Sequence, residues 1–253
     1  MSAYVQDVFM LFGDSITQGA WAPGDTGIGQ RLSHVYARKL DVLNRGYSGY
    51  NTEWGLPILD QCIAKPHDTV RTPKIKVLTI WFGANDACIK PSPQHVPLER
   101  FIANLQAMIT LVRERSPETH IILITAPPVN TIARKADLEA RDPPQALDRL
   151  FATSKAYADA TKTLAAEHGV GVVDAWGALW TACGEEEAKF AAFSGDGLHL
   201  NARGYEVVYH ELIKVISERY PDVHPDKLES VFPLWKDIDW ASPQSSLYVS
   251  RRE

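Results

Sequence analysis

The chain has 253 residues, of which 45% are hydrophobic and 23% charged, with a net charge of −5 and a pI near 5.9. This length suits one α/β domain with a large core, and the composition excludes wholesale disorder. The acidic balance argues against a nucleic-acid or anionic-membrane partner, and no stretch approaches the roughly 20 apolar residues of a membrane span.

The first half of the chain alternates apolar runs with amphipathic stretches. The run VFMLF is unbroken, which is typical of a strand buried on both faces. The segment KIKVLTIWFG is rich in β-branched and aromatic residues and predicts a second strong strand. Strands are predicted over 8–12, 42–47 and 74–83, and helices over 28–40 and 52–64.

The second half continues the alternation. The clearest helix is 97–115, where apolar residues recur at helical spacing after Pro97. A strand over 120–128 ends at two prolines, and the polar segment 129–146, which contains two more prolines, is expected to be a loop or irregular insertion. A helix over 147–168, a strand over 170–176 and a helix over 201–220 follow.

Strands separated by helices predict right-handed crossovers and a parallel sheet with helices on both faces. No composition break marks a second large domain within residues 1–220. Residues 221–253 differ from the rest because they combine Pro and Asp with several aromatic side chains. We expect this extension to pack on the domain, to lie at a dimer interface or to wall the pocket. The sequence does not decide whether the protein is a homodimer.

The three cysteines, Cys62, Cys88 and Cys183, are far apart and form no CxxC pair. An odd number of separated thiols is typical of a reduced protein rather than of a disulfide framework or a zinc site. The first residues, MSAYVQDVF, carry no charged leader and run into the first strand. We therefore expect a cytoplasmic protein without stable membrane insertion.

Four polar, glycine-bearing stretches follow strands or precede a helix. They are GDS (13–15), GYSGYNT (46–52), GAND (83–86) and SGDGLHLN (194–201). In an open parallel sheet, ligands bind beyond the carboxyl ends of the strands, so these stretches are candidates for one site. Turn-like sequences are also expected there in any such fold, and their residue content must decide.

Ser15 is a candidate nucleophile, but a serine hydroxyl needs a base to remove its proton. Of eight histidines, most fall in predicted helices or connections, while His95 lies in a proline-rich loop and stays open. His199 is favoured because Asp196 lies three residues earlier, where a carboxylate can fix the imidazole tautomer. The alternative for this pair is a loop that caps the following helix.

Acyl transfer also needs hydrogen-bond donors for a developing oxyanion. Gly49 can offer a backbone N–H without a blocking side chain, Asn85 can offer its amide, and the N–H of Ser15 is a third donor. Taken singly, Gly49 is a turn glycine and Asn85 an Asx-turn or cap residue. Taken together with a nucleophile and a base at the carboxyl end of the strands, Gly49 and Asn85 favour an oxyanion hole. Asp14 is expected to hydrogen-bond the turn that presents the serine.

Competing chemistries lack their motifs. There is no GxGxxG or GxxxxGK[ST] phosphate cradle, no HExxH or clustered Cys/His, and no GxSxG elbow. We expect neither a cofactor nor a metal.

The four stretches together resemble the SGNH hydrolases, also called the GDSL esterase/lipase family, in family order from residue 13 to 201. The first block departs in one place, since Ile16 stands where the family has leucine. The resemblance implies a flavodoxin-like α/β/α sandwich around a five-stranded parallel sheet. It also implies Ser15 as nucleophile, His199 as base and Asp196 as its orienter, with Ser15, Gly49 and Asn85 forming the oxyanion hole.

Longer segments, among them LNRGYSGYNTEWGL and the closing FPLWKDID, are similar to the isoamyl acetate-hydrolysing esterases. This implies hydrolysis of short-chain carboxylic esters such as acetates of small alcohols. Trp21, Trp54 and Trp81 lie near the blocks and are expected either to wall an apolar pocket or to pack in the core. The same site could instead serve a carbohydrate deacetylase, a thioesterase or a lysophospholipase, and the alternative of another class is a catalytically silent binding module.

Overall fold

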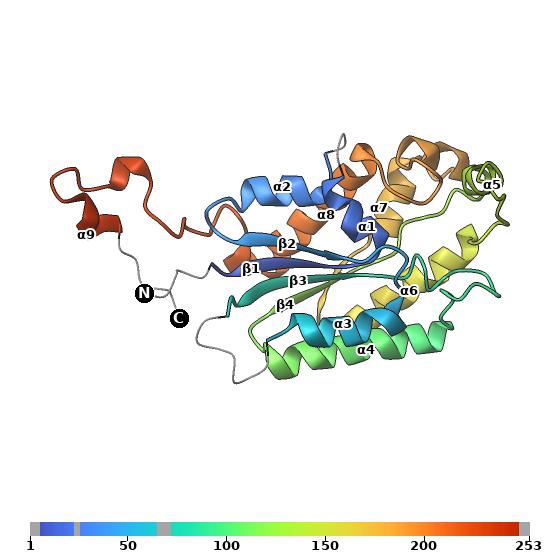
Figure 1. Cartoon of the computed structure of the whole chain (residues 1–253), viewed down its shortest axis with the longest axis horizontal. Helices are drawn as coiled ribbons and strands as arrows, with labels where there is room; N and C mark the ends of the chain where they lie inside the picture. The colour runs from blue at the N-terminus through green and yellow to red at the C-terminus, as the bar shows by residue number, and fades with distance from the viewer. Residues whose placement is uncertain (1–5, 23–25, 65–71, 248–253) are drawn as a thin grey trace.

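A computed structural model describes residues 6–22, 26–64 and 72–247 and contains a five-stranded sheet (Figure 1). Neighbouring strands all run parallel, in the order β2-β1-β3-β4-β5. This is the flavodoxin-like order, so the predicted fold class is confirmed. The strands are β1 (Val8–Gly13), β2 (Asp41–Gly46), β3 (Ile75–Trp81), β4 (His120–Ile124) and β5 (Gly171–Val173).

Helices cover both faces of the sheet and complete the predicted three-layer sandwich (Figure 1). Side chains of β1 alternate between the faces, so Phe9 packs in one core and Phe12 in the other. One face carries α2 (Ile28–Val35), α7 (Ala175–Ala182) and α8 (Ala202–Arg219); the other carries α3 (Thr52–Cys62), α4 (Leu98–Arg115) and α6 (Phe151–Glu167).

The strand order reverses at β1. The chain leaves β1 for β2 on one side and later returns to β3 on the other side of β1. The connections therefore separate to opposite faces at the carboxyl ends of β1 and β3, which opens a crevice there. Ser15 follows β1 and Asn85 follows β3, so the topology alone brings these two residues to the same end of the sheet.

Two expectations about the second half of the chain were wrong, and one helix was not predicted. The segment 129–146 is not wholly irregular, because α5 (Thr131–Glu139) begins at an N-cap where the Asn130 side chain accepts the N–H of Ala133. The predicted strand 170–176 is shorter, since Asp174 caps α7 by accepting the N–H of Gly177. β5 therefore ends at Val173, and Trp176 lies on a helix that the sequence pattern did not reveal.

The first part of the C-terminal extension is fixed to the domain. Val223 is buried, its carbonyl accepts the Tyr36 hydroxyl, and the N–H of Val231 donates to the carbonyl of Arg38. Beyond these contacts the extension, with η4 (Trp235–Asp237) and α9 (Pro243–Leu247), reaches away from the body (Figure 1). It lies at the end of the sheet opposite to the turn that follows β1, so it does not wall the Ser15 region of its own chain (Figure 1).

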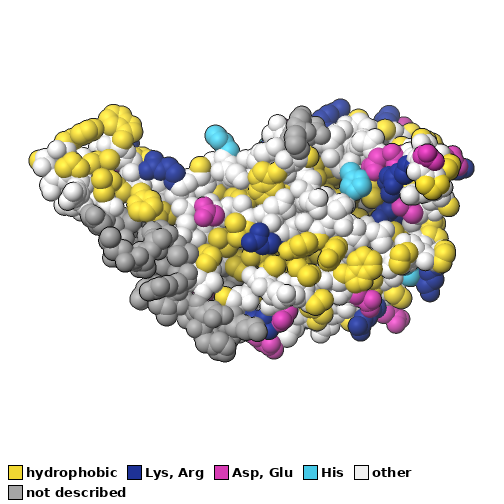
Figure 2. Space-filling view, viewed as in Figure 1, with side chains coloured by type: hydrophobic (Ala, Val, Ile, Leu, Met, Phe, Trp, Pro, Cys, Tyr) yellow, Lys and Arg dark blue, Asp and Glu magenta, His cyan; other side chains and the backbone are white. Residues whose placement is uncertain are grey.

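Hydrophobic side chains gather on this arm, residues 234–247, in the view of Figure 2. Trp235 and Trp240 are each 73% exposed, and their rings meet edge to face with centroids 6.4 Å apart. Its role at a dimer interface stays a prediction. Short 3₁₀ segments complete the described structure: η1 (Gly19–Trp21), η2 (Glu187–Ala192) and η3 (Pro221–Val223).

Candidate active site

The turn after β1 presents Ser15 as the first residue of α1 (Ser15–Gln18). Asp14 caps this helical turn, since its Oδ1 accepts the N–H of Ile16 at 2.9 Å. Gly13 allows the tight packing of the turn, because a Cβ there would lie 2.2 Å from Thr17 Oγ1 and 2.4 Å from the Trp81 carbonyl oxygen. The backbone thus fixes where the serine hydroxyl emerges.

Ser15, His199 and Asp196 form a continuous chain of hydrogen bonds. Ser15 Oγ lies 2.9 Å from His199 Nε2, and His199 Nδ1 lies 2.8 Å from Asp196 Oδ2. An ionised carboxylate only accepts, so Nδ1 carries a proton and neutral His199 has an unprotonated Nε2 facing the serine. The imidazole is therefore placed to accept the Ser15 proton.

The charge of Asp196 is strongly stabilised. Burial raises the pKa of its carboxyl, but the hydrogen bond and charge of His199 and the N–H groups of His199 and Leu198 outweigh burial. The net result holds the pKa of Asp196 well below its usual range. Arg134 also donates from Nη1 to Asp196 Oδ2 at 2.7 Å. Asp196 is therefore a fixed anion at neutral pH.

The loop before α8 holds Asp196 and His199 in place. Gly195 N–H donates to the His199 carbonyl, and Ser194 bridges to Leu200, which closes a tight loop around Asp196. Gly197 has φ +81°, and a Cβ there would lie 2.6 Å from the backbone nitrogen of Arg134. The glycine lets the loop approach α5, the helix that lies where an irregular segment was expected.

Gly49 and Asn85 are joined at the end of the sheet. Asn85 Nδ2 donates to the Tyr50 carbonyl at 2.7 Å, which links the loop after β3 to the residue beside Gly49. The Gly49 loop is tied to the serine turn as well, because Tyr47 N–H donates to the Gly13 carbonyl at 2.8 Å. Gly49 has φ +81°, a conformation that favours glycine. Hydrogen bonds thus connect all three glycine-bearing turns.

Burial disfavours the ionised form of two carboxyl groups near the site, those of Asp14 and Asp86. Burial raises the pKa of Asp14 to about 7 and that of Asp86 to about 6. Asp86 holds the Gly49 side of the site, because Oδ1 accepts both the N–H and the hydroxyl of Thr52, and Oδ2 accepts Gly83 N–H. Asp14 caps the turn that carries Ser15 through its contact with the Ile16 N–H. The carboxylate that contacts a ring nitrogen of His199 is that of Asp196.

Replacing Asp14 by Asn keeps an acceptor for Ile16 N–H but removes the ionisation. A raised pKa in the folded state gives stability that is present below pH 3.8 and lost as pH rises through about 7. The parent therefore loses stability as the pH rises, and Asp14→Asn does not. Relative to the parent, the unfolding free energy of Asp14→Asn should rise by about 3 kcal/mol from about pH 5 to about pH 8. Denaturant unfolding at both pH values measures this, with the exposed Asp226→Asn as control. An equal difference at both pH values would contradict it.

The three tryptophans lie in different environments. Trp81 is 3% exposed and its indole N–H donates to the Thr125 carbonyl, so it is a core residue and offers a substrate no surface. Trp54 is 41% exposed and meets Tyr50 edge to face. Trp21 is partly buried, against the backbone of Gly29. For Trp54 and Trp21 the role of pocket walls stays a prediction.

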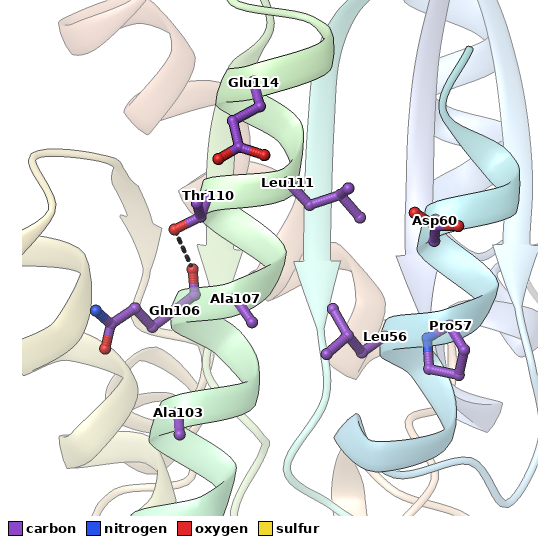
Figure 3. Close-up of a pocket in the computed structure, with 9 residues that line it drawn as sticks. All are labelled: Leu56, Pro57, Asp60, Ala103, Gln106, Ala107, Thr110, Leu111 and Glu114. Atoms are coloured by element: carbon purple, nitrogen blue, oxygen red, sulfur yellow. Dashed lines mark hydrogen bonds between the residues drawn. The ribbon is translucent and has the colours of Figure 1, made fainter. Parts of the chain in front are cut away.

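A groove of about 610 Å³ lies between α3 and α4, and its lining does not include Ser15, Asp196 or His199 (Figure 3). Its polar groups are unsuited to nucleophilic catalysis, since the Thr110 hydroxyl is bonded to the Gln106 carbonyl and its described lining residues include no histidine.

Within the described ranges, no group of three or more His, Cys, Asp or Glu side chains is arranged to hold a metal. None of the described helices is long and apolar enough to cross a membrane.

Four polar residues around the site had no clear signal in the sequence. Arg134 contacts Asp196, Arg149 Nη2 donates to Asn85 Oδ1 at 2.5 Å, and Asp148 lies between the two arginines. Gln94 Nε2 donates to the Gly49 carbonyl at 2.8 Å. The dipeptide Asp148-Arg149 follows two prolines, at the start of the helix predicted over 147–168, whereas α6 begins at Phe151. Only the burial of its arginine sets it apart.

Known proteins resemble this chain over most of its length. A family model, the GDSL-like Lipase/Acylhydrolase family, matches residues 11–207. The chain is 38% identical over 241 residues to the isoamyl acetate-hydrolyzing esterase 1 homolog of Bos taurus, covering 94% of this chain and 90% of that protein. It is 34% identical over 251 residues to the isoamyl acetate-hydrolyzing esterase of Saccharomyces cerevisiae, covering 91% and 94%.

The solved lipase/acylhydrolase of Enterococcus faecalis has the same fold, with a TM-score of 0.60 and 24% identity over 88% of this chain and 98% of that one. The family match spans most of the chain, and the similar esterases align over nearly their whole length. The chain therefore belongs to the GDSL-like lipase/acylhydrolase family and is a carboxylic ester hydrolase.

Proposed function

We propose that this enzyme hydrolyses short-chain carboxylic esters, acetates of small alcohols in particular, through an acyl-enzyme on Ser15. The observation that carries the mechanism is the hydrogen-bonded chain from Ser15 Oγ to His199 to Asp196 at the carboxyl end of β1. The substrate class is supported by the names of the similar esterases from cattle and yeast.

In the first half-reaction, Ser15 Oγ attacks the ester carbonyl carbon and His199 Nε2 takes the serine proton. The carbonyl oxygen becomes an oxyanion, which accepts hydrogen bonds from the N–H groups of Ser15 and Gly49 and from Asn85 Nδ2. When the bond to the alcohol oxygen breaks, the proton on His199 passes to that oxygen. The alcohol leaves and the acyl group stays on Ser15.

In the second half-reaction, water takes the place of the alcohol. His199 removes a proton from the water as its oxygen attacks the acyl carbon, and the same donors hold the second oxyanion. Breaking of the bond to Ser15 Oγ returns the proton to the serine and releases the acid. Asp196 stays ionised throughout and stabilises the imidazolium in both halves.

Asn85 suits the role of oxyanion donor because its amide is already oriented. Oδ1 accepts from Arg149, and one N–H of Nδ2 donates to the Tyr50 carbonyl. The second N–H is the one proposed to meet the oxyanion. Asn85→Ala should therefore lower kcat by about 10²–10³ with little change in KM. Steady-state kinetics with a short ester measures this, and a change confined to KM would make Asn85 a substrate-binding residue instead.

The substrate proposal is tested with a panel in which acyl length and leaving group vary separately. Esters of one phenol with acyl chains from acetyl to lauroyl give the acyl preference, and we expect kcat/KM to be highest for the shortest chains. Isoamyl acetate, an acetylated sugar, an acyl thioester and a lysophospholipid give the leaving-group preference. A higher kcat/KM for any of the last three than for isoamyl acetate would overturn the proposed substrate class.

A further inference from the structure

Two arginines beside the site are almost fully buried, with side chains 5% (Arg134) and 4% (Arg149) exposed. Burying a guanidinium costs desolvation free energy unless its N–H donors are paired. The partners of these two groups therefore indicate what the arginines do. We propose that Arg134 and Arg149, joined through Asp148, are positioning residues that hold Asp196 and Asn85. This inference rests on the proposed roles of Asp196 and Asn85 and assigns new roles to three other residues.

Arg134 connects Asp196 to Asp148. Its Nη1 donates to Asp196 Oδ2 at 2.7 Å, the oxygen that also accepts His199 Nδ1. Its Nε and Nη2 form a paired contact with the two carboxylate oxygens of Asp148, at 3.1 and 2.9 Å. A two-pronged pair of this kind fixes the plane of the guanidinium and hence the direction of the remaining donor. Arg134 therefore fixes the oxygen of Asp196 on which the imidazole depends.

Arg149 connects Asp148 to Asn85. Its Nη1 donates to Asp148 Oδ2, and its Nε donates to the Ala84 carbonyl at 2.7 Å. Its Nη2 donates to Asn85 Oδ1 at 2.5 Å. Because the oxygen of the Asn85 amide is held by a cation, the amide cannot flip, and its N–H groups are polarised toward stronger donation. The same contact thus orients and strengthens the proposed oxyanion donor.

The charges balance along this line of side chains. Although burial opposes the charge, pairing with the arginines lowers the pKa of Asp148, and pairing with Asp148 and Asp196 raises the pKa of Arg134. Asp137 lies 3.7 Å from Arg134 on the same helix. Asp196 and Asp14 act on His199 directly, from the loop before α8 and from the turn after β1. Arg134 contacts Asp196, and Asp148, Asp137 and Arg149 follow it along the line.

Arg149 is tested by a double-mutant cycle with Asn85. Arg149→Met should lower kcat by about 10- to 100-fold with KM within about twofold, since it disturbs a donor used in the transition state. In the Asn85→Ala background the same change should lower kcat by less than about threefold, because the group it positions is gone. An equal loss in both backgrounds, or no loss in the parent, overturns the role.

A second substitution guards against a folding defect. Arg149→Lys keeps the charge, but one ammonium cannot reach three acceptors with the planar geometry of a guanidinium. It should therefore recover part of the kcat lost in Arg149→Met and show the same dependence on Asn85. Arg100→Gln, which removes the arginine of an exposed pair with Glu53, is the matched control and should leave kcat unchanged.

Arg134 is tested by the pH profile. Its positive charge opposes formation of the imidazolium next to Asp196, so Arg134→Gln should move the acid limb of kcat/KM to higher pH by about one unit. Arg134→Lys should lower kcat while leaving the limb in place. An unmoved limb in Arg134→Gln overturns this role. If Asn85→Ala alone leaves kcat unchanged, the proposed oxyanion hole fails instead, so the two failures are distinguishable.

Discussion

Ser15→Ala should lower kcat for a short activated ester by about 10⁴–10⁶-fold, the largest loss that we expect in this chain. The hydroxyl is the attacking atom in the proposed mechanism, and neither Asp196 nor Asn85 can replace it. Ser15 Oγ bonds to His199 Nε2, whereas the turn itself is held by Asp14 and the Ile16 N–H, so the substitution leaves the turn intact. Loss of activity should therefore come without loss of fold.

The control for this substitution is Ser48→Ala, which removes an exposed hydroxyl from the residue before Gly49. It should keep kcat within about twofold, since the substitution of an exposed side chain that caps or pairs with no buried group changes little. Circular dichroism and thermal unfolding should match the parent for both variants. A Ser15→Ala enzyme that kept more than a tenth of the parent kcat would rule out the serine mechanism.

Asp196→Asn should lower kcat by about 10⁴-fold, the loss that follows when the histidine is held in the wrong tautomer. The Asp196 carboxylate accepts from four groups: the N–H groups of Leu198 and His199, the ring of His199 and Arg134. An amide nitrogen at this position must face one of these donors, whichever way the amide turns. The substitution therefore breaks the imidazole orientation and leaves Arg134 with one fewer anion.

The matched control is Asp137→Asn, which changes a carboxylate that pairs with Arg141 at the surface of α5. It should lower kcat by less than about threefold, because Asp137 pairs with arginines and not with the histidine ring. Stopped-flow or steady-state measurements of ester hydrolysis give both values. If Asp196→Asn lost less activity than Asp137→Asn, Asp196 would not be the partner of the histidine.

The parts of the fold that could be predicted share one cause. Strands buried on both faces, such as VFMLF, have no polar positions and so stand out from amphipathic helices. The glycine-bearing turns after β1, β2 and β3 are likewise visible because tight turns restrict residue type. The carboxyl-end rule for parallel sheets then assigns Ser15, Gly49 and Asn85 to one edge of the sheet from the order of the elements alone. In the fold, hydrogen bonds link the three turns that carry these residues.

The parts that could not be predicted depend on contacts between distant segments. α5 lies between two proline pairs, which suggested an irregular insertion, and its N-cap Asn130 gave a weaker signal than the prolines. The line from Asp196 through Arg134, Asp148 and Arg149 has no sequence period, because its members come from separate loops and a helix. Buried charges of this kind are recognised only when the structure shows which side chains they pair with.

Covalent labelling of Ser15 tests the serine mechanism most directly. The parent enzyme is treated with a fluorophosphonate, which phosphonylates an activated serine, and its peptides are mapped by mass spectrometry. We expect one adduct per chain, on the peptide that contains Ser15, with activity lost in proportion to labelling. The adduct should be absent in Ser15→Ala and form at least about 10²-fold more slowly in His199→Ala, which lacks the base. Complete labelling elsewhere, with Ser15 unmodified and activity lost, would contradict the mechanism.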